Sequence, residues 1–307
     1  MNYLITIIGP TAIGKTALSI ALAQHFKCEI VSCDSRQFFK EMQIGTAVPT
    51  LQELEVAKHH FIQNKSIFQP YTVGDFEKEA LAKLDVLFEQ NNIQILVGGS
   101  GLYADAVCKG MDVFPAIDIN IRELVTTKFQ QYGLSFLQQT LAELDPDYTA
   151  ILVKTNPQTL QNPQRMMRFV EVCWATNTPY SSFLNKKKAT RNFIPIWIGL
   201  EAERAVLYSR INQRVAIMLQ EGLAAEAQKL LPNKHLNALQ TVGYREIFDF
   251  FEGKITFDCA VESIKQNTRR FAKRQLTWFK KNDEITWFDF ETNHNEIIAH
   301  LEKQMNT

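Results

Sequence analysis

The chain has 307 residues, of which 46% are apolar, and its 33 Lys and Arg residues balance 33 Asp and Glu residues to a formal net charge of zero. This composition is typical of a globular protein of about two domains. The zero balance argues against a protein coated with positive charge for general adhesion to nucleic acids. Five cysteines without a Cys-x-x-Cys pair favour reduced thiols over a disulfide framework or a zinc ribbon.

No stretch approaches the roughly 18 apolar residues of a membrane span. The N-terminal residues MNYLITIIGP lack the basic segment of a signal peptide. We therefore expect a cytoplasmic protein with no membrane partner, and a monomer by default.

Apolar strand-like runs alternate with helical patterns over the first hundred residues. Strands are predicted at residues 3–8, 29–33 and 93–97, and helices at residues 15–26 and 75–90. Continuous apolar strands separated by helices are typical of a parallel sheet covered on both faces. The sequence therefore predicts an α/β fold with a doubly wound parallel sheet.

The pattern changes near Met111. Helix-like segments at residues 121–132, 135–144 and 163–175 are separated by prolines, and the next predicted strand is at residues 194–200. Three helices are predicted after it, at residues 201–221, 223–231 and about 257–281. We expect a first part of the core at residues 1–112, an all-helical insertion at 113–191, and a second part of the core at 192–307.

The strongest motif is Gly9-Pro10-Thr11-Ala12-Ile13-Gly14-Lys15-Thr16, which fits G-x-x-x-x-G-K-[ST] between a predicted strand and a predicted helix. Its glycines let backbone N–H groups point into one concavity at a helix N-terminus, where anions are favoured. Lys15 adds a mobile cation and Thr16 a hydroxyl for Mg²⁺. We expect a bound phosphate with Mg²⁺ as cofactor; a glycine turn without a ligand is the alternative.

A carboxylate follows the second predicted strand. Nucleotide-hydrolysing proteins normally place an acid at the end of a neighbouring strand, but residues 93–97 lead into Gly98-Gly99-Ser100-Gly101. Asp34 instead lies at a strand's carboxyl end, where α/β proteins bind ligands. We interpret Asp34 as a group that acts on a second substrate, with an N-cap of the following helix as the alternative.

With Asp34-Ser35-Arg36-Gln37 and Gly98-Gly99-Ser100-Gly101-Leu102-Tyr103, the chain resembles the tRNA dimethylallyltransferases, which modify adenosine next to the anticodon. The resemblance spans about residues 4–290 and includes Gly45-Thr46-Ala47, Asn162-Pro163-Gln164-Arg165, Val242-Gly243-Tyr244-Arg245-Glu246 and residues 268–279. It departs at Ser100, where the family usually has threonine, and at Ile13, where a small polar residue is common. A serine or a threonine hydroxyl suits position 100, and position 13 contributes mainly its backbone.

The resemblance implies a transferase with an α/β, P-loop NTPase-like core. The reaction moves a dimethylallyl group from dimethylallyl diphosphate to the N6 amine of the adenosine 3′-adjacent to the anticodon. The diphosphate would bind the loop of residues 9–16 with Mg²⁺, held through Thr16. Asp34 would be the general base. Ser100, Lys15 and Arg214 would complete the catalytic set, with Arg214 contacting the diphosphate and Lys15 meeting its developing charge.

A basic stripe is predicted on the last long helix. The pairs Arg269/Lys273 and Arg270/Arg274 share one side at i, i+4 spacing, and Ile264, Phe271 and Trp278 are expected to form the opposite, buried side. A one-sided stripe suits a phosphate backbone, whereas a merely solvated face is the alternative. Lys186, Lys187, Lys188 and Arg191 form a second, weaker cluster.

The partner implied by the resemblance is the anticodon stem-loop of tRNA, with the target base extruded towards Asp34. The helical insertion would grip the RNA. Besides the basic stripe, the contact residues implied are Asp34, Ser35, Arg36, Gln37, Ser100, Arg122, Gln164, Arg165, Met166, Met167 and Arg168. Packing is the favoured role of the two methionines.

Other functions share parts of these motifs. An adenylate isopentenyltransferase acting on free nucleotide has the same loop and base, but does not need the insertion and the basic helix. A P-loop small-molecule kinase is supported by the loop alone. A non-catalytic RNA-binding module leaves Asp34 and the complete phosphate loop without a role.

Overall fold

The computed structural model describes residues 1–184 and 190–306. The chain divides into two compact units: Met1–Gly110 with Thr190–Thr307, called here the core unit, and Met111–Ala189, called the helical unit. The helical unit thus begins and ends two residues before the insertion expected at residues 113–191. Lys186, Lys187 and Lys188, three members of the second basic cluster, lie outside the described residues.

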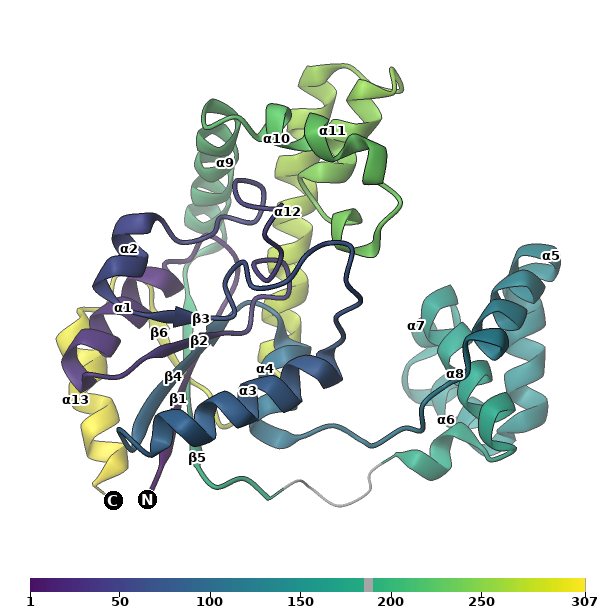
Figure 1. Cartoon of the computed structure of the whole chain (residues 1–307), viewed down its shortest axis with the longest axis horizontal. Coiled ribbons are helices and arrows are strands. Elements are labelled where there is room, and N and C mark those ends of the chain that lie inside the picture. The colour runs from purple at the N-terminus through teal and green to yellow at the C-terminus, as the bar shows by residue number, and fades with distance from the viewer. Residues whose placement is uncertain (185–189, 307) are drawn as a thin grey trace. The chain divides into compact units, whose positions relative to one another are not determined.

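A parallel sheet forms the centre of the core unit (Figure 1). Its order among the described residues is β3-β2-β4-β1-β5-β6, and the paired strands are parallel. The strands are β1 (Tyr3–Ile8), β2 (Ile30–Ser32), β3 (His59–His60), β4 (Ile93–Gly98), β5 (Ile194–Glu201) and β6 (Thr286–Asp289). Because β5 follows the helical unit in sequence yet pairs with β1, the insertion interrupts one continuous sheet.

Alternate residues of the central strands pack against opposite layers. Along β1, Ile5 and Ile7 belong to one apolar cluster, and Leu4 and Ile8 belong to another. All four are fully buried. Burial on both faces explains why these strands appear as continuous apolar runs, and the predicted doubly wound α/β core with a helical insertion is confirmed.

Helices cover both faces of the sheet. On one face lie α1 (Lys15–Phe26) and α13 (His294–Met305), and on the other lie α3 (Val73–Phe88) and α4 (Gly101–Lys109). A further apolar cluster joins parts of α9 (Arg204–Gln220), α10 (Leu223–Leu230), α11 (Tyr244–Phe251) and α12 (Phe257–Phe279). The short helix α2 (Leu51–Val56) and the 3₁₀ turns Leu231–Asn233 and Asn237–Leu239 complete the unit.

The helical unit has its own core, which includes the fully buried Val125, Leu137, Leu141 and Val170. Its elements are α5 (Ile119–Leu144), α6 (Pro146–Thr155), α7 (Pro157–Leu160), α8 (Pro163–Thr176) and the 3₁₀ turn Tyr180–Phe183. Gly133 leaves helical geometry inside α5, at the gap between the two helices predicted there. The prolines begin α6, α7 and α8, because the first helical position needs no N–H donor.

The structure corrects three expectations. The helix predicted from residue 201 starts at Arg204, because Glu201 still pairs in β5. More elements follow β5 than the three predicted helices, including α11, β6 and α13. The expected buried stripe of the last helix is wrong beyond Ile264, since Phe271 and Trp278 are 38% and 40% exposed.

The buried residues of α12 are instead Ala260, Ile264, Ala272, Gln275 and Phe279. Phe271 and Trp278 turn towards a cavity rather than towards the core.

No helix within residues 1–184 and 190–306 has the length and apolar character needed to cross a membrane.

Candidate active site

Three loops meet at the carboxyl edge of the sheet because the strands before them are neighbours in the order β2-β4-β1. The phosphate loop follows β1, the segment beginning at Asp34 follows β2, and Gly99-Ser100 follows β4. Carboxyl ends of parallel strands share one edge, where α/β proteins bind ligands. Motifs separated by tens of residues in sequence are thereby brought together.

The phosphate loop leads directly into α1. Gly14 has φ 112°, in the left-handed region that favours glycine, and it precedes the helix without a side-chain cap. The first amides of α1 therefore remain available to an anion. The Ile13 side chain is buried in the core, so this position presents only its backbone to a ligand.

Lys15 reaches back over the loop. Its Nζ donates to the carbonyl oxygens of Pro10 at 2.7 Å and Gly9 at 3.1 Å. Burial lowers the pKa of Lys15 to about 8; Asp34 opposes this decrease and Arg214 adds to it. The amine therefore gives up its proton far more readily than an exposed lysine.

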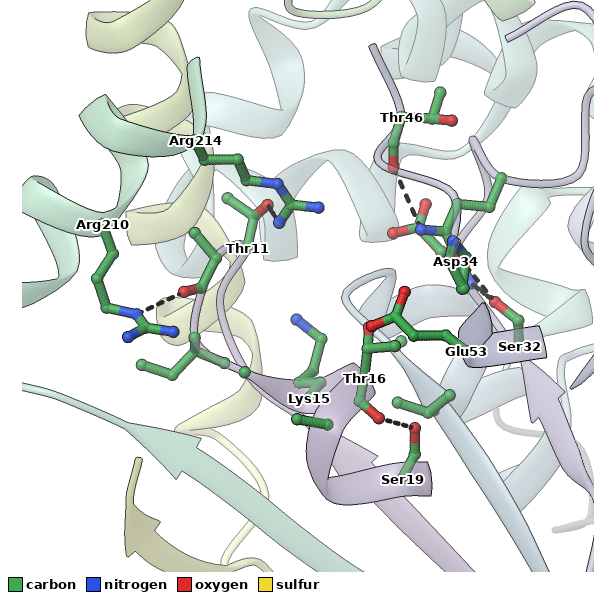
Figure 2. Close-up of a pocket in the computed structure, with 18 of the residues that line it drawn as sticks. Thr11, Lys15, Thr16, Ser19, Ser32, Asp34, Thr46, Glu53, Arg210 and Arg214 are labelled. Carbon is green, nitrogen blue, oxygen red and sulfur yellow. Dashed lines mark hydrogen bonds between the residues drawn. The ribbon is translucent and has the colours of Figure 1, made fainter. Parts of the chain in front are cut away.

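Two arginines of α9 also reach the loop (Figure 2). Arg214 Nη1 donates to Thr11 Oγ1 at 3.3 Å, and Arg210 Nε donates to the Ala12 carbonyl at 2.9 Å. Their i, i+4 spacing puts both on one face of the helix. Sequence analysis missed Arg210, although this spacing was visible beside Arg214. Burial lowers the pKa of Arg214, and Asp34 opposes the effect.

Two cavities adjoin at the sheet edge. The first, of about 450 Å³, is lined by the phosphate loop, and the second, of about 540 Å³, by Ser35, Arg36, Ser100 and Tyr103. The residues that line both are Thr11, Asp34, Thr46, Arg214, Phe271 and Gln275. Asp34 and Arg214 thus lie where a ligand in one cavity would meet a ligand in the other.

Only one oxygen of the Asp34 carboxylate accepts a hydrogen bond within the described residues. Asp34 Oδ1 accepts the Arg36 N–H at 3.0 Å within a turn. No helix begins there, so the N-cap alternative is wrong. Oδ2 has no hydrogen-bond partner among the described residues, which leaves one oxygen open to a ligand.

Gln275 of α12 ties two of the loops together. Its Nε2 donates to the Gly99 carbonyl at 2.8 Å, and its Oε1 accepts the Thr11 N–H at 2.9 Å. A Cβ at residue 99 would lie 2.3 Å from Gln275 Nε2, so this close approach requires glycine. Gln275 lay inside the motif of residues 268–279, but sequence analysis gave it no role.

The hydroxyl of Ser100 is engaged within the site. It accepts the Ser35 N–H at 3.1 Å and donates to Ser35 Oγ at 3.0 Å. Ser100 thereby couples the loop after β4 to the segment after β2 while it lines the second cavity.

An aromatic and cationic wall borders the second cavity. It consists of Phe271, Arg274 and Trp278 of α12. The Arg274 guanidinium lies 5.7 Å from the Phe271 ring centre, and Trp278 Nε1 donates to Asp105 at 2.8 Å. Phe271 and Trp278 are exposed because their side chains face this cavity and not the core.

Two further residues of the first cavity were missed by sequence analysis. Glu53, labelled in Figure 2, comes from α2 and lines this cavity. It forms a capping box with Thr50, a pattern that the sequence shows. His59 lies in β3, and its Nδ1 contacts the Ala57 carbonyl at 2.7 Å. Its Nε2 is buried and without a partner among the described residues, and burial lowers its pKa.

Some predicted RNA contacts have structural partners. Arg36 Nη1 donates to the carbonyls of Asn237 and Ala238, and Gln37 Nε2 donates to those of Thr46 and Ala47. Both side chains therefore hold neighbouring loops in place.

The basic residues of α12 differ in their exposure and in their contacts with other side chains. Arg269 donates to Asn212 and lies over the Tyr208 ring. Arg270, Lys273 and Arg274 are exposed, although Arg270 also donates to Asn267.

The remaining predicted contacts all belong to the helical unit. Arg122 and Arg168 each lie 3.8 Å from the carboxylate of Glu171, which holds them in one ionic cluster. Gln164 and Arg165 are exposed at the start of α8. Met166 has no exposed surface and packs in the unit's core, so an RNA contact by its side chain is excluded. Met167 is partly buried against the same cluster.

Glu226 of α10 holds the loop that carries Thr46. Its two oxygens accept the N–H groups of Gln43 at 3.1 Å, Ile44 at 2.9 Å and Gly45 at 3.0 Å. The Tyr244 hydroxyl donates to the same carboxylate at 2.6 Å. The Gly45-Thr46-Ala47 and Val242–Glu246 motifs therefore meet at one partly buried contact, for which sequence analysis gave no role.

Sequence comparison finds close relatives of the chain. The model of the IPP transferase family matches residues 37–282. The tRNA dimethylallyltransferase of Flavobacterium johnsoniae is 67% identical over 301 residues, which cover 98% of this chain and 97% of the relative. The tRNA dimethylallyltransferase 1 of Bacteroides fragilis is 42% identical over 299 residues, which cover 97% of each.

Solved structures are similar over nearly the whole chain. The tRNA isopentenylpyrophosphate transferase of Bacillus halodurans has a TM-score of 0.71 and 34% identity, covering 100% of this chain and 99% of that one. A eukaryotic dimethylallyltransferase, described as acting on tRNA, has a TM-score of 0.79 and 25% identity, covering 95% of this chain and 75% of that one.

We expect Glu226→Gln to loosen the loop of residues 43–47. The amide replaces one acceptor oxygen by a donor that faces other donors, and hydrogen bonds to charged groups are worth roughly 1.5–3 kcal/mol. The free energy of unfolding should fall by about that amount, and the amides of residues 43–45 should exchange faster. Exposed Glu221→Gln is the matched control; equal exchange in both variants would contradict the role of Glu226.

Proposed function

We propose, because the chain belongs to the IPP transferase family, that it is a tRNA dimethylallyltransferase. It transfers a dimethylallyl group from dimethylallyl diphosphate to the N6 amine of the adenosine 3′-adjacent to the anticodon and releases diphosphate. The observation that carries this function is the position of Asp34 and Arg214, which line both the phosphate-loop cavity and the adjoining cavity. A carboxylate and a cation at that junction suit a transfer between two substrates.

The first cavity suits the diphosphate. Lys15, Arg210 and Arg214 supply positive charge, and the loop and the start of α1 supply N–H donors. These groups would stabilise the negative charge that grows on the departing diphosphate.

Thr16 is the residue that would hold Mg²⁺. Its hydroxyl lines the first cavity and has no hydrogen bond among residues 1–184 and 190–306. The described chain has no cluster of three His, Cys, Asp or Glu side chains suited to a metal. This fits Mg²⁺, which usually combines few protein oxygens with substrate phosphates and waters. When bound, Mg²⁺ would neutralise part of the diphosphate charge.

The second cavity suits the acceptor adenine. The N6 nitrogen would attack the first carbon of the dimethylallyl group as the bond from that carbon to the diphosphate oxygen breaks. The nitrogen loses one proton in this exchange, and the open oxygen of Asp34 can accept it. Phe271 and Trp278 offer aromatic surface for an extruded base.

The RNA backbone has two sets of cations available. Arg270, Lys273 and Arg274 are exposed on α12, and Arg122, Arg165 and Arg168 lie on the helical unit. Such clusters suit phosphate contacts despite a net charge of zero.

The direct test is incubation with dimethylallyl diphosphate, Mg²⁺ and unmodified tRNA, followed by mass analysis of the released nucleosides. We expect one prenylated adenosine per tRNA, located 3′ of the anticodon. Parallel reactions contain AMP as the acceptor, or ATP as a phosphoryl donor. Faster prenylation of AMP than of tRNA, or phosphoryl transfer without prenylation, would overturn the proposal.

We expect Asp34→Asn to lower kcat roughly 100- to 10,000-fold, the usual contribution of a general base. Asparagine keeps an oxygen for the Arg36 N–H but cannot accept the N6 proton. Single-turnover prenylation gives the rate, and filter binding gives the Kd for tRNA, which should change little. Exposed Asp283→Asn is the control. A variant with normal turnover would exclude Asp34 as the base.

We expect kcat/KM for dimethylallyl diphosphate to fall as the pH rises through about 8, the pKa of Lys15. Below that pH the amine carries the charge that binds diphosphate, and above it the charge is lost. Lys15→Arg should lower the overall value but remove this decrease, because arginine stays protonated. The same decrease in both proteins would show that another group causes it.

A further inference from the structure

The cavity beside the phosphate loop contains a carboxylate to which the proposed function gives no role. The acids among its described lining residues are Asp34 and Glu53, and the lysine and arginine residues are Lys15, Arg210 and Arg214. Asp34 also lines the second cavity, whereas Glu53 lines the first of these two cavities alone. Glu53 therefore faces the space that suits the diphosphate and not the space that suits the adenine.

The cap of α2 engages only one oxygen of Glu53. Oε2 accepts the Thr50 N–H at 2.7 Å and the Thr50 hydroxyl at 3.1 Å, as part of the capping box. Oε1 has no hydrogen-bond or ion-pair partner within residues 1–184 and 190–306. A glutamine would complete the same capping box, so the cap of α2 does not require a negative charge at this position.

A negative charge in this cavity opposes the binding of diphosphate unless a cation lies between the two. Like charges that face each other across a binding site weaken the complex. Thr16 at the start of α1 and Glu53 on α2 both line this cavity (Figure 2). A metal ion bound between the Glu53 carboxylate and the diphosphate would turn this repulsion into attraction.

The strand next to the phosphate loop supplies no acid to this cavity. In P-loop NTPases, Mg²⁺ is held by the hydroxyl of the phosphate loop and by an acid that follows a neighbouring strand. Here the end of β4 reaches the cavity through Val97 and Gly98, which carry no carboxylate. Glu53 brings a carboxylate to the same cavity from α2. The helix thus provides the group that the strand lacks.

His59 adds a hydrogen-bond acceptor to the same cavity. Its Nδ1 lies 2.7 Å from the Ala57 carbonyl, and because a carbonyl only accepts, Nδ1 carries the proton. In the neutral ring Nε2 then has the lone pair. This atom is buried and has no partner among the described residues. Mg²⁺ keeps several of its waters when it binds to proteins, and such a water is a donor that suits Nε2.

We infer that Glu53 is the carboxylate that holds Mg²⁺ beside the diphosphate, together with the hydroxyl of Thr16. The inference rests on the proposed function, because it takes diphosphate and Mg²⁺ as the occupants of this cavity. One carboxylate, one hydroxyl, phosphate oxygens and waters form a ligand set that Mg²⁺ commonly has. Glu53 then favours diphosphate binding when the metal is present and opposes it when the metal is absent.

The test compares the affinity for inorganic diphosphate with and without the metal. Calorimetric titration gives the Kd of the wild-type chain and of Glu53→Gln, once with excess Mg²⁺ and once with EDTA. Mg²⁺ should tighten binding to the wild type, and Glu53→Gln should lose roughly 10- to 100-fold of this gain, the usual cost of removing a group that supports a bound metal. In EDTA the variant should bind diphosphate more tightly than the wild type, because the repulsion is gone.

Three controls separate metal binding from other effects. Glu55→Gln changes an exposed acid of α2 that does not line the cavity, and it should keep the full gain from Mg²⁺. Thr50→Ala removes the capping hydroxyl but keeps the Glu53 carboxylate, and it should keep most of the gain. Asp34→Asn should also keep it, because Asp34 is assigned to the proton of the adenine.

The outcomes distinguish this inference from the proposed function. An equal gain from Mg²⁺ in the wild type and in Glu53→Gln would overturn the assignment of Glu53. Equal weakening of Glu53→Gln in Mg²⁺ and in EDTA would also overturn it, since the residue would then act only through the structure of α2. Loss of the gain in Asp34→Asn alone would move the metal contact to Asp34. A wild-type chain that binds no diphosphate would instead overturn the diphosphate site of the proposed function.

Discussion

The parallel pairing of β1 with both β4 and β5 is the constraint on which the site depends. Tyr3 lies opposite Ile93 on one side and Ile194 on the other, so segments separated by the whole helical unit join one sheet. Because these strands run in the same direction, the phosphate loop, Asp34 and Ser100 come to the same edge. The order and direction of the strands thus bring together site residues that are far apart in the sequence.

Contacts from the second half of the chain then fix the loops at that edge. Gln275 joins the phosphate loop to Gly99, and Glu226 holds the backbone before Thr46. Arg210 and Arg214 reach the phosphate loop from α9. Side chains that satisfy the polar groups of these loops favour one conformation of them. The helices after the insertion therefore shape the site as much as the motifs before it.

Charge is distributed between the two units rather than spread evenly. The core unit concentrates cations around the phosphate loop and along α12, while the helical unit pairs Arg122 and Arg168 with buried Glu171. A net charge of zero is compatible with such local concentrations because it sums the charges of the whole chain and does not fix where they lie. A shaped RNA can meet these clusters without general adhesion to nucleic acids.

The sequence by itself determined the α/β class, the central strands and the phosphate loop, because these follow from apolar periodicity and a local motif. It also located the insertion, through prolines that proved to begin helices. Only tertiary structure decided that Gln275 and Glu226 position loops, that Met166 is buried, and that Phe271 and Trp278 face a cavity. Helical periodicity places residues on a face, but what that face meets depends on contacts between segments distant in sequence.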